Sequence, residues 1–145
     1  SINLVVIGQT YFSTAAKNNF LSFAKGVLGA EHLRVFADIP RDQVLKILSK
    51  ADLCVLPSVN EPASISVVES LVLGTAVICS KSNQSRLYVE MVEPSWVIDD
   101  NDIDGFVVTA LGILGDDADK HDFSKVRYVT SFDSWSSHFQ QILHS

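Results

Sequence analysis

The chain has 145 residues, of which 47% are hydrophobic, and its net charge is −6 with an isoelectric point near 5.0. This length and composition predict a single folded domain over residues 1–145. The acidic balance argues against a nucleic-acid binder, and no apolar run reaches the roughly 18 residues that a membrane span requires.

Five short apolar runs predict β-strands that are buried on both faces. These runs are residues 2–8, 33–37, 52–58, 75–80 and 95–99. Near-continuous apolar runs bounded by turn residues are typical of parallel strands that helices cover on both sides.

Amphipathic segments alternate with these strands. Ser13 is a predicted helix cap, Gly29 ends that helix, and Pro40 opens the next one. Further helices are predicted from about Ser64 to Gly74, after Asp102 to residue 114, and over 131–143. Strand–helix alternation predicts right-handed βαβ units and an α/β, Rossmann-like fold: a doubly wound parallel sheet with helices on both faces.

In such a sheet, ligands bind beyond the carboxyl ends of the strands. One such carboxyl end leads into the helix that starts near Ser64, and two acids flank this helix start. Glu61 lies in the preceding loop, and Glu69 lies in the helix. Helical spacing predicts an apolar stripe formed by Ile65, Val68 and Val72 and widened by Val67 and Leu71. Glu69 falls at the edge of that stripe, where a carboxylate is partly desolvated and needs hydrogen-bond donors.

This helix entrance suits a phosphate and sugar ligand. The amides of residues 64 to 66 can hold a phosphate, and each carboxylate can accept hydrogen bonds from sugar hydroxyls. A structural role explains the spacing equally well: Glu61 is then solvated, and Glu69 caps a neighbouring loop.

Residues 51–80, ADLCVLPSVNEPASISVVESLVLGTAVICS, resemble the C-terminal, donor-binding domain of GT-B-type retaining glycosyltransferases, namely glycosyltransferase family 4 or glycosyl transferases group 1. The shared pattern is a strand, Pro-Ser, Glu61, seven residues, Glu69, and a helix that ends in glycine before the next strand. The segments NLVVIG, LRVFADIPRDQVLKILSKA and SFDSWSSHFQQIL extend the resemblance over nearly the whole chain.

The resemblance implies transfer of a hexose-type sugar from a nucleotide-sugar, UDP- or GDP-linked, to a glycan, lipid or protein acceptor. The transfer would retain the anomeric configuration and use no metal or other cofactor. Glu61 would be the catalytic residue against the transferred sugar, and Glu69 would bind the ribose. The remaining implied donor-binding residues are Ala63, Ser64, Ile65 and Ser66, at the sugar and diphosphate, and Asp38 and Ile39, which would face the base.

The chain departs from the family pattern at several positions. Ser64 replaces a glycine, and Asn83-Gln84 replaces Gly-Gly. Lys81 and Arg86 are either phosphate-binding cations or solvated charges. The substitutions keep an alternative open, a catalytically degenerate GT-B domain that serves as an interaction or regulatory module, and an epimerase of GT-B architecture is a third option.

The family's first strand–helix unit, with the arginine and lysine that bind the diphosphate, and its N-terminal acceptor domain have no counterpart in the sequence. We therefore expect a fragment of a two-domain enzyme, the second half of a GT-B fold, that is inactive by itself. Its oligomeric state stays open.

Other classes of site find little support. The four histidines have no metal-ligand spacing, and no Gly-x-Ser-x-Gly motif is present. The acids Asp99, Asp100, Asp102 and Asp104 fit a helix start better than a calcium loop. Cys54 and Cys79 lie inside apolar runs, which favours buried thiols over a disulfide. Together with the absence of a signal-peptide pattern in SINLVVIGQT, this predicts a cytoplasmic protein.

Overall fold

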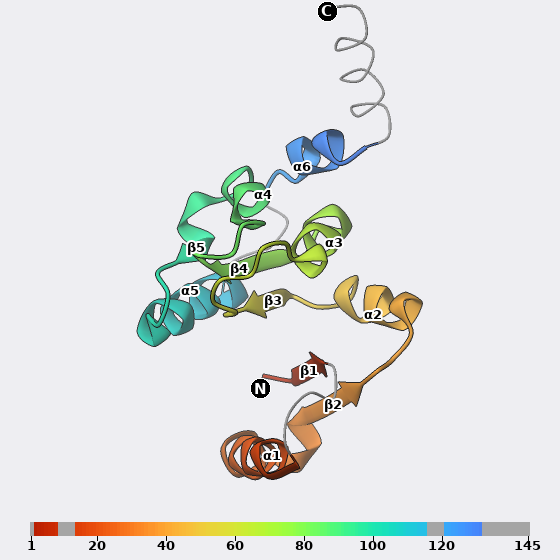
Figure 1. Cartoon of the computed structure of the whole chain (residues 1–145), viewed down its shortest axis with the longest axis vertical. Coiled ribbons are helices and arrows are strands. Elements are labelled where there is room, and N and C mark those ends of the chain that lie inside the picture. Colours follow the sequence, from red (N-terminus) through yellow and green to blue (C-terminus); the bar gives the residue numbers. More distant parts are fainter. Residues whose placement is uncertain (1, 9–13, 116–120, 132–145) are drawn as a thin grey trace, which may run out of the picture. The chain divides into compact units, whose positions relative to one another are not determined.

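The computed structural model describes residues 2–8, 14–115 and 121–131 (Figure 1). The chain divides into two compact units, Ser1–Val44 and Leu45–Ser145, and each is described by itself. Ser13 and nearly all of the helix predicted over 131–143 lie outside the described residues. The assignment of residues 1–145 to one domain stays a prediction.

The first unit is a βαβ unit. Strand β1 (Leu4–Gly8) pairs in parallel with β2 (Leu33–Ala37), and Leu4 lies opposite Leu33. Helix α1 (Thr14–Leu28) and the 3₁₀ turn η1 (Ala30–His32) connect the strands. Gly29 has a φ of 87°, a positive value that glycine adopts without strain, and it ends α1 as predicted.

Within this unit, burial of the two strands is partial. Leu33 is buried, whereas Leu4, Val5 and Val35 are 36–38% exposed.

The second unit contains a three-stranded parallel sheet in the order β3 (Leu53–Leu56), β4 (Ala76–Ser80), β5 (Val97–Ile98). All five residues of β4 are buried, so both faces of this central strand are covered. Helices α3 (Ile65–Leu73) and α5 (Ile103–Gly115) pack on β4 and are drawn on either side of it in Figure 1. The parallel α/β class is therefore confirmed.

The core of the second unit lies between β4 and its helices. Its buried members are Val67, Leu71, Ala76, Val77, Ile78, Cys79, Val89, Trp96, Ile98, Ile113, Phe123 and Val126. In α3 the buried face is therefore formed by Val67, Ser70 and Leu71, whereas Ile65 is 66% exposed. The predicted stripe is therefore right for Val67 and Leu71 and wrong for Ile65 and Val72. Because α3 is apolar around most of its circumference, periodicity alone could not select the buried face.

The same ambiguity affects α5. Phe106, Ala110 and Ile113 pack on or in the core, while the apolar residues Ile103 and Leu111 are 73% and 57% exposed. None of the helices among the described residues is both long and apolar enough to cross a membrane.

Four short elements were not predicted. They are η1, α4 (Arg86–Glu90), the 3₁₀ turn η2 (Pro94–Trp96) and α6 (Ser124–Val129), and none exceeds six residues. Helix α2 (Arg41–Leu48), by contrast, begins directly after Pro40 as predicted. Elements of one or two turns carry too little periodicity to be recognised in sequence.

Candidate functional site

Three loops meet at the carboxyl edge of the second sheet. They are the 57–64 loop after β3, the 81–85 loop after β4 and the 99–102 loop after β5. All three strands run parallel, so their carboxyl ends share one edge, which is where open α/β sheets bind ligands. The first loop leads into α3 and carries Glu61.

Three hydrogen bonds join the 57–64 loop to the 81–85 loop, and we call them the loop clamp. They run from Asn60 N to Ser82 Oγ (2.8 Å), from Gln84 N to Glu61 O (3.0 Å) and from Ser64 N to Ser85 Oγ (2.8 Å). The clamp therefore fixes the main chain before, at and after Glu61.

Glu61 is half-buried within this loop. Its carbonyl oxygen belongs to the loop clamp, but its carboxylate has no hydrogen-bond or ionic partner among the described residues. Asn60, immediately before it, has a φ of 58°, which an asparagine tolerates better than most residues. A half-buried carboxylate on a fixed main chain, with no partner in the described part of the chain, is available to a ligand.

The entrance of α3 differs in one respect from the prediction. Ser64 has extended backbone angles and precedes the helix, but its side chain forms no capping hydrogen bond. Its amide donates to Ser85 Oγ. The expectation that the amides of residues 64 to 66 are all free is therefore wrong for Ser64. The amides of Ile65 and Ser66 belong to the first turn, which has no intrahelical acceptor for them.

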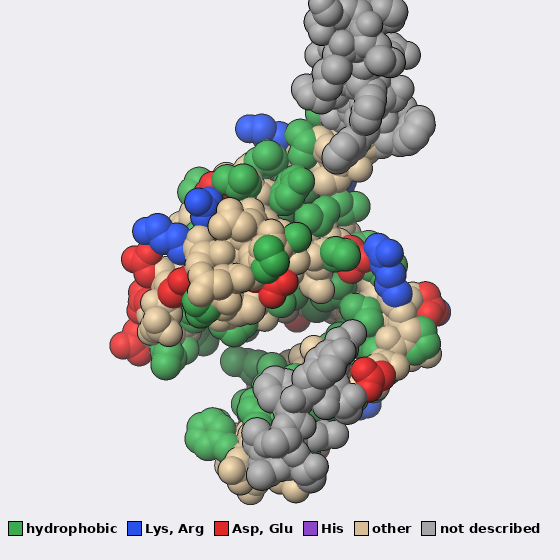
Figure 2. All heavy atoms as spheres, in the orientation of Figure 1, with side chains coloured by type: hydrophobic (Ala, Val, Ile, Leu, Met, Phe, Trp, Pro, Cys, Tyr) green, Lys and Arg blue, Asp and Glu red, His purple; other side chains and the backbone are tan. Residues whose placement is uncertain are grey.

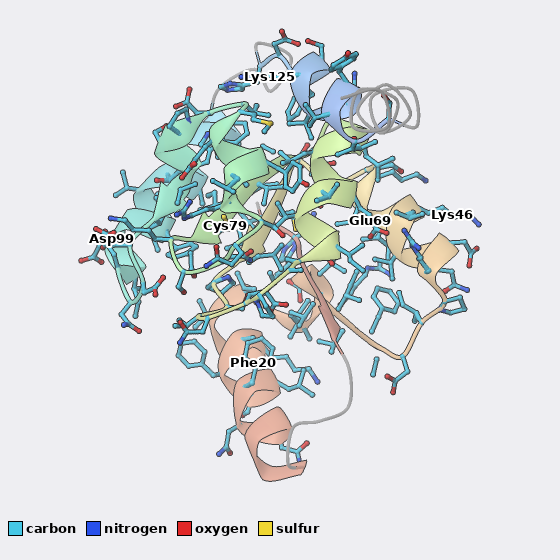
Figure 3. All side chains as sticks on the ribbon, turned by 45° about the horizontal axis from the view of Figure 1, so that its top comes forward. Phe20, Lys46, Glu69, Cys79, Asp99 and Lys125 are labelled. Carbon is cyan, nitrogen blue, oxygen red and sulfur yellow. The ribbon has the colours of Figure 1, made fainter. Side chains whose placement is uncertain are left out.

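Glu69 is half-buried on α3, where Figure 3 labels it. Its partial burial agrees with the predicted position at the edge of the core-facing surface, and its side chain already has an interaction within the protein. Ala63 is exposed in the 57–64 loop. Asp38 and Ile39 follow β2 in the first unit, at its carboxyl end, and Asp38 has a φ of 53°.

Lys81 and Arg86 are both engaged by protein groups. Lys81 Nζ lies 2.8 Å from Asp99 Oδ1, and Arg86 bonds to the Lys81 carbonyl oxygen and to Glu90. The hydrogen bond with Asp99 raises the pKa of the Lys81 ammonium. Figure 2 shows basic and acidic side chains intermingled along this side of the second unit. Of the two readings for these cations, the charge-paired surface role has the direct structural support.

These charged groups line an open hollow beside β5. Its volume is about 430 Å³, and it is lined by Lys81, Arg86, Glu90, Pro94, Val97, Ile98, Asp99 and Asp102. Asp102 also accepts a hydrogen bond from Gly105 N in the first turn of α5, which confirms the helix-start role predicted for this acid. Asp100 instead accepts from Ser82 N.

Asn83 is a buried polar residue of the site whose structural role the sequence does not predict. Its side chain is completely buried, and Oδ1 accepts from Ser85 N at 2.9 Å. Its Nδ2 has no partner among the described atoms. In the sequence this position is notable only because Asn83 replaces a glycine of the family pattern. Nothing in the sequence predicts that Ser82 and Ser85 contact the 57–64 loop.

The two cysteines are free thiols, as predicted. Cys79 is buried at the end of β4, in the interior of the second unit (Figure 3), and burial raises its pKa to about 11. Cys54 is half-buried on β3, and burial raises its pKa as well. In the part of the chain that the structure describes, no three His, Cys, Asp or Glu residues cluster in a way that could hold a metal ion.

Known proteins match the chain at the level of family and fold. The model of the family "Glycosyl transferases group 1" matches residues 1–128. Among solved structures, sucrose-phosphate synthase from Thermosynechococcus elongatus is similar, with a TM-score of 0.75 at 18% sequence identity. The match covers 98% of this chain and 38% of that one. No curated protein sequence matches significantly. With its family model matched over most of its length and its parallel α/β architecture similar to a GT-B glycosyltransferase, this chain belongs to the glycosyl transferases group 1 family.

Proposed function

We propose that this chain binds the nucleotide-sugar donor of a glycosyltransferase, with the sugar beside Glu61 and the diphosphate at the start of α3. Membership of the glycosyl transferases group 1 family supports a sugar-transferring role. The observation that carries the proposal is the half-buried Glu61 carboxylate, which has no partner among the described residues and precedes a helix entrance at the carboxyl edge of the sheet.

The proposed chemistry follows from where charge develops. When the sugar leaves its nucleotide, negative charge grows on the diphosphate. The amides of Ile65 and Ser66 and the positive end of the α3 dipole would stabilise that charge, an interaction that needs no metal. Glu61 would then orient the sugar, and the transfer would retain the anomeric configuration.

The nucleoside would be held by other side chains. Glu69 would accept hydrogen bonds from the ribose hydroxyls, because one carboxylate can accept from two adjacent hydroxyls. Asp38 and Ile39 would face the base, with UDP- or GDP-linked hexoses as the preferred donors. The acceptor, a glycan, lipid or protein, would bind elsewhere in the whole protein.

Nucleotide binding is the direct test. Thermal unfolding of the chain is measured with UDP, GDP and ADP. A nucleotide present at 100 times its dissociation constant is expected to add about 2.7 kcal/mol to the free energy of unfolding. If none of the three nucleotides shifts the transition, in this chain or in the whole protein, the donor-binding proposal fails. That outcome would favour a degenerate GT-B domain with an interaction or regulatory role.

The two glutamates separate binding from chemistry. Glu69→Gln removes a charged acceptor, so nucleotide affinity is expected to fall roughly 10- to 100-fold by isothermal titration calorimetry. Glu61→Gln is expected to leave that affinity nearly unchanged and to slow sugar transfer by the whole protein. Glu31→Gln, an exposed change in the first unit, is the control. The opposite pattern would mean that the two roles are exchanged.

A further inference from the structure

The loop clamp includes two side chains that are not part of the proposed ligand contacts. Each serine hydroxyl accepts a hydrogen bond from a main-chain amide of the 57–64 loop. Ser82 Oγ accepts from Asn60 N, and Ser85 Oγ accepts from Ser64 N. Glu61 lies between these two points. The side-chain hydroxyls of one loop therefore determine the path of the segment that presents the catalytic carboxylate.

The main-chain amide of each serine also forms a hydrogen bond with a side chain. The amide of Ser82 donates to Asp100 Oδ1 at 3.1 Å, which ties it to the 99–102 loop. The amide of Ser85 donates to Asn83 Oδ1 at 2.9 Å. Ser85 is only 6% exposed. Two relays, Asp100–Ser82–Asn60 and Asn83–Ser85–Ser64, therefore support the loop at both sides of Glu61.

Asn83 adds an independent observation. Its side chain is wholly buried, yet Nδ2 has no partner among the described atoms. A buried donor without a partner is destabilising. The contact that Asn83 does make, through Oδ1 to the Ser85 amide, orients the serine that holds Ser64. Through this contact, Asn83 belongs to the relay that supports the main chain at Ser64.

We propose that Ser82 and Ser85 are positioning residues that hold Glu61 in its productive place through the loop clamp; this rests on the proposed function of Glu61. Neither serine touches the reacting atoms. They act by fixing the main chain of residues 60–64, since small displacements of a reacting group slow chemistry much more than they weaken binding. Because the Ser64 amide already donates to Ser85 Oγ, only the amides of Ile65 and Ser66 would remain to bind the diphosphate.

The clamp is tested first by amide hydrogen exchange of the chain, followed by NMR. In Ser82→Ala the Asn60 amide is expected to exchange about 10-fold faster, and in Ser85→Ala the Ser64 amide likewise, as loss of one hydrogen bond predicts. Amides within α3 should keep their rates. Ser58→Ala is the matched control, because the Ser58 hydroxyl forms no hydrogen bond among the described residues. Unchanged exchange at Asn60 and Ser64 would overturn the proposal.

The positioning role is tested by steady-state kinetics of the whole protein. Ser82→Ala and Ser85→Ala are expected to lower kcat by roughly 10- to 100-fold, while KM for the donor changes less than about three-fold. Ser82→Thr, which keeps the hydroxyl at a half-buried position, is expected to restore kcat. Faster amide exchange with an unchanged kcat, or equal effects on kcat and KM, would contradict positioning.

The exchange and the kinetic measurements distinguish failure of the proposed function from failure of the positioning role. If the whole protein binds no nucleotide and transfers no sugar, the proposed function is overturned, and the positioning role with it. The exchange rates would still show whether the clamp exists. An active parent protein with unaltered exchange in both alanine variants overturns the clamp alone.

Discussion

At the scale of single residues, hydrogen-bond partners decide which groups of the site are available to a ligand. Ser64, which the resemblance aligns with a glycine of the family, already donates its amide hydrogen to Ser85 Oγ. Glu61 has its carbonyl oxygen bound and its carboxylate unpartnered within the described part of the chain. The proposed phosphate site consequently has one amide donor fewer than the sequence predicts, whereas the Glu61 carboxylate has no partner among the described residues.

Cys79 gives a prediction at this scale. Burial, followed by the nearby Glu90 carboxylate, raises the pKa of its thiol from 9.0 to about 11. At pH 8 the thiolate fraction is then roughly 100-fold lower than in the unfolded chain. We expect iodoacetamide to label Cys79 at least about 100-fold more slowly in the native chain than in urea, as measured by mass spectrometry of the digested protein.

The same shift has a consequence for stability. A protonated Cys79 stabilises the fold fully below pH 9.0, and this contribution is lost as the pH rises through about 11. Cys79→Ala should remove that part of the pH dependence. Native labelling at the rate of the unfolded chain would show that the thiol is not buried.

At the scale of elements, α3 is defined by its two ends. Its start follows the extended Ser64, and its end is Gly74, with a φ of 88° and an amide that donates to the carbonyl oxygen of Leu71. Arg127 of α6 donates from Nε to the carbonyl oxygen of Val72 at 2.9 Å, so a cation also lies at the carboxyl end of the helix. The helix that carries Glu69 is thereby held at a fixed length.

Gly74→Ala tests this helix end. The left-handed φ costs a residue with a β-carbon about 1–2 kcal/mol, and the new β-carbon would lie 3.1 Å from Arg127 Nη2. We expect the free energy of unfolding in urea to fall by roughly that amount. Gly74→Asn also adds a β-carbon, but asparagine tolerates this φ and should lose distinctly less. Equal losses would assign the effect to crowding at Arg127 rather than to backbone strain.

The start of α5 has an equivalent arrangement. Asp102 Oδ1 accepts from Gly105 N at 2.9 Å. A β-carbon at Gly105 would collide with the Asp102 carboxylate. The capping acid and the glycine three residues later therefore depend on each other, since the side chain of one occupies the space beside the other.

At the scale of the whole molecule, the core cluster of the described residues belongs to the second unit. Every member of the core cluster lies between Val67 and Val126, within Leu45–Ser145. The three loops of the candidate site, 57–64, 81–85 and 99–102, lie in the same unit. The elements that position Glu61 and Glu69 thus all belong to the second unit.

Excision of the first unit tests whether the second unit folds by itself. We expect a chain of residues 45–145 to unfold cooperatively in urea by circular dichroism, because every member of the core cluster lies within it. Leu71→Ala in that chain leaves a cavity in the core and should lower the free energy of unfolding by about 2–5 kcal/mol. A non-cooperative transition in the unsubstituted chain would mean that the first unit is needed to fold the second.

Much of the fold can be read from local sequence. Pro40 marks the start of α2, and Gly29 and Gly74 mark the ends of α1 and α3, because backbone restriction and freedom are properties of single residues. The five strands follow from short apolar runs. The spacing from Glu61 to Glu69 between two strands also led to the correct family, since motif spacing is itself a sequence property.

Other features depended on packing that the sequence does not specify. The buried face of α3 uses Val67 and Leu71 rather than Ile65, because an almost wholly apolar helix can be buried on several faces and the sheet selects one. The contacts of Ser82 and Ser85 with the 57–64 loop join residues 21 or 22 positions apart, which only adjacent parallel strands bring together.

The sequence by itself thus determined the strand–helix order, the helix ends and the pair of acids, because each follows from local backbone preference or from spacing along the chain. Only the tertiary structure decided which amides at the α3 entrance remain open and which hydroxyls hold the Glu61 loop. Those outcomes depend on how the ends of β3, β4 and β5 are aligned at one edge. That alignment is a property of non-local pairing, and no short segment of the chain encodes it.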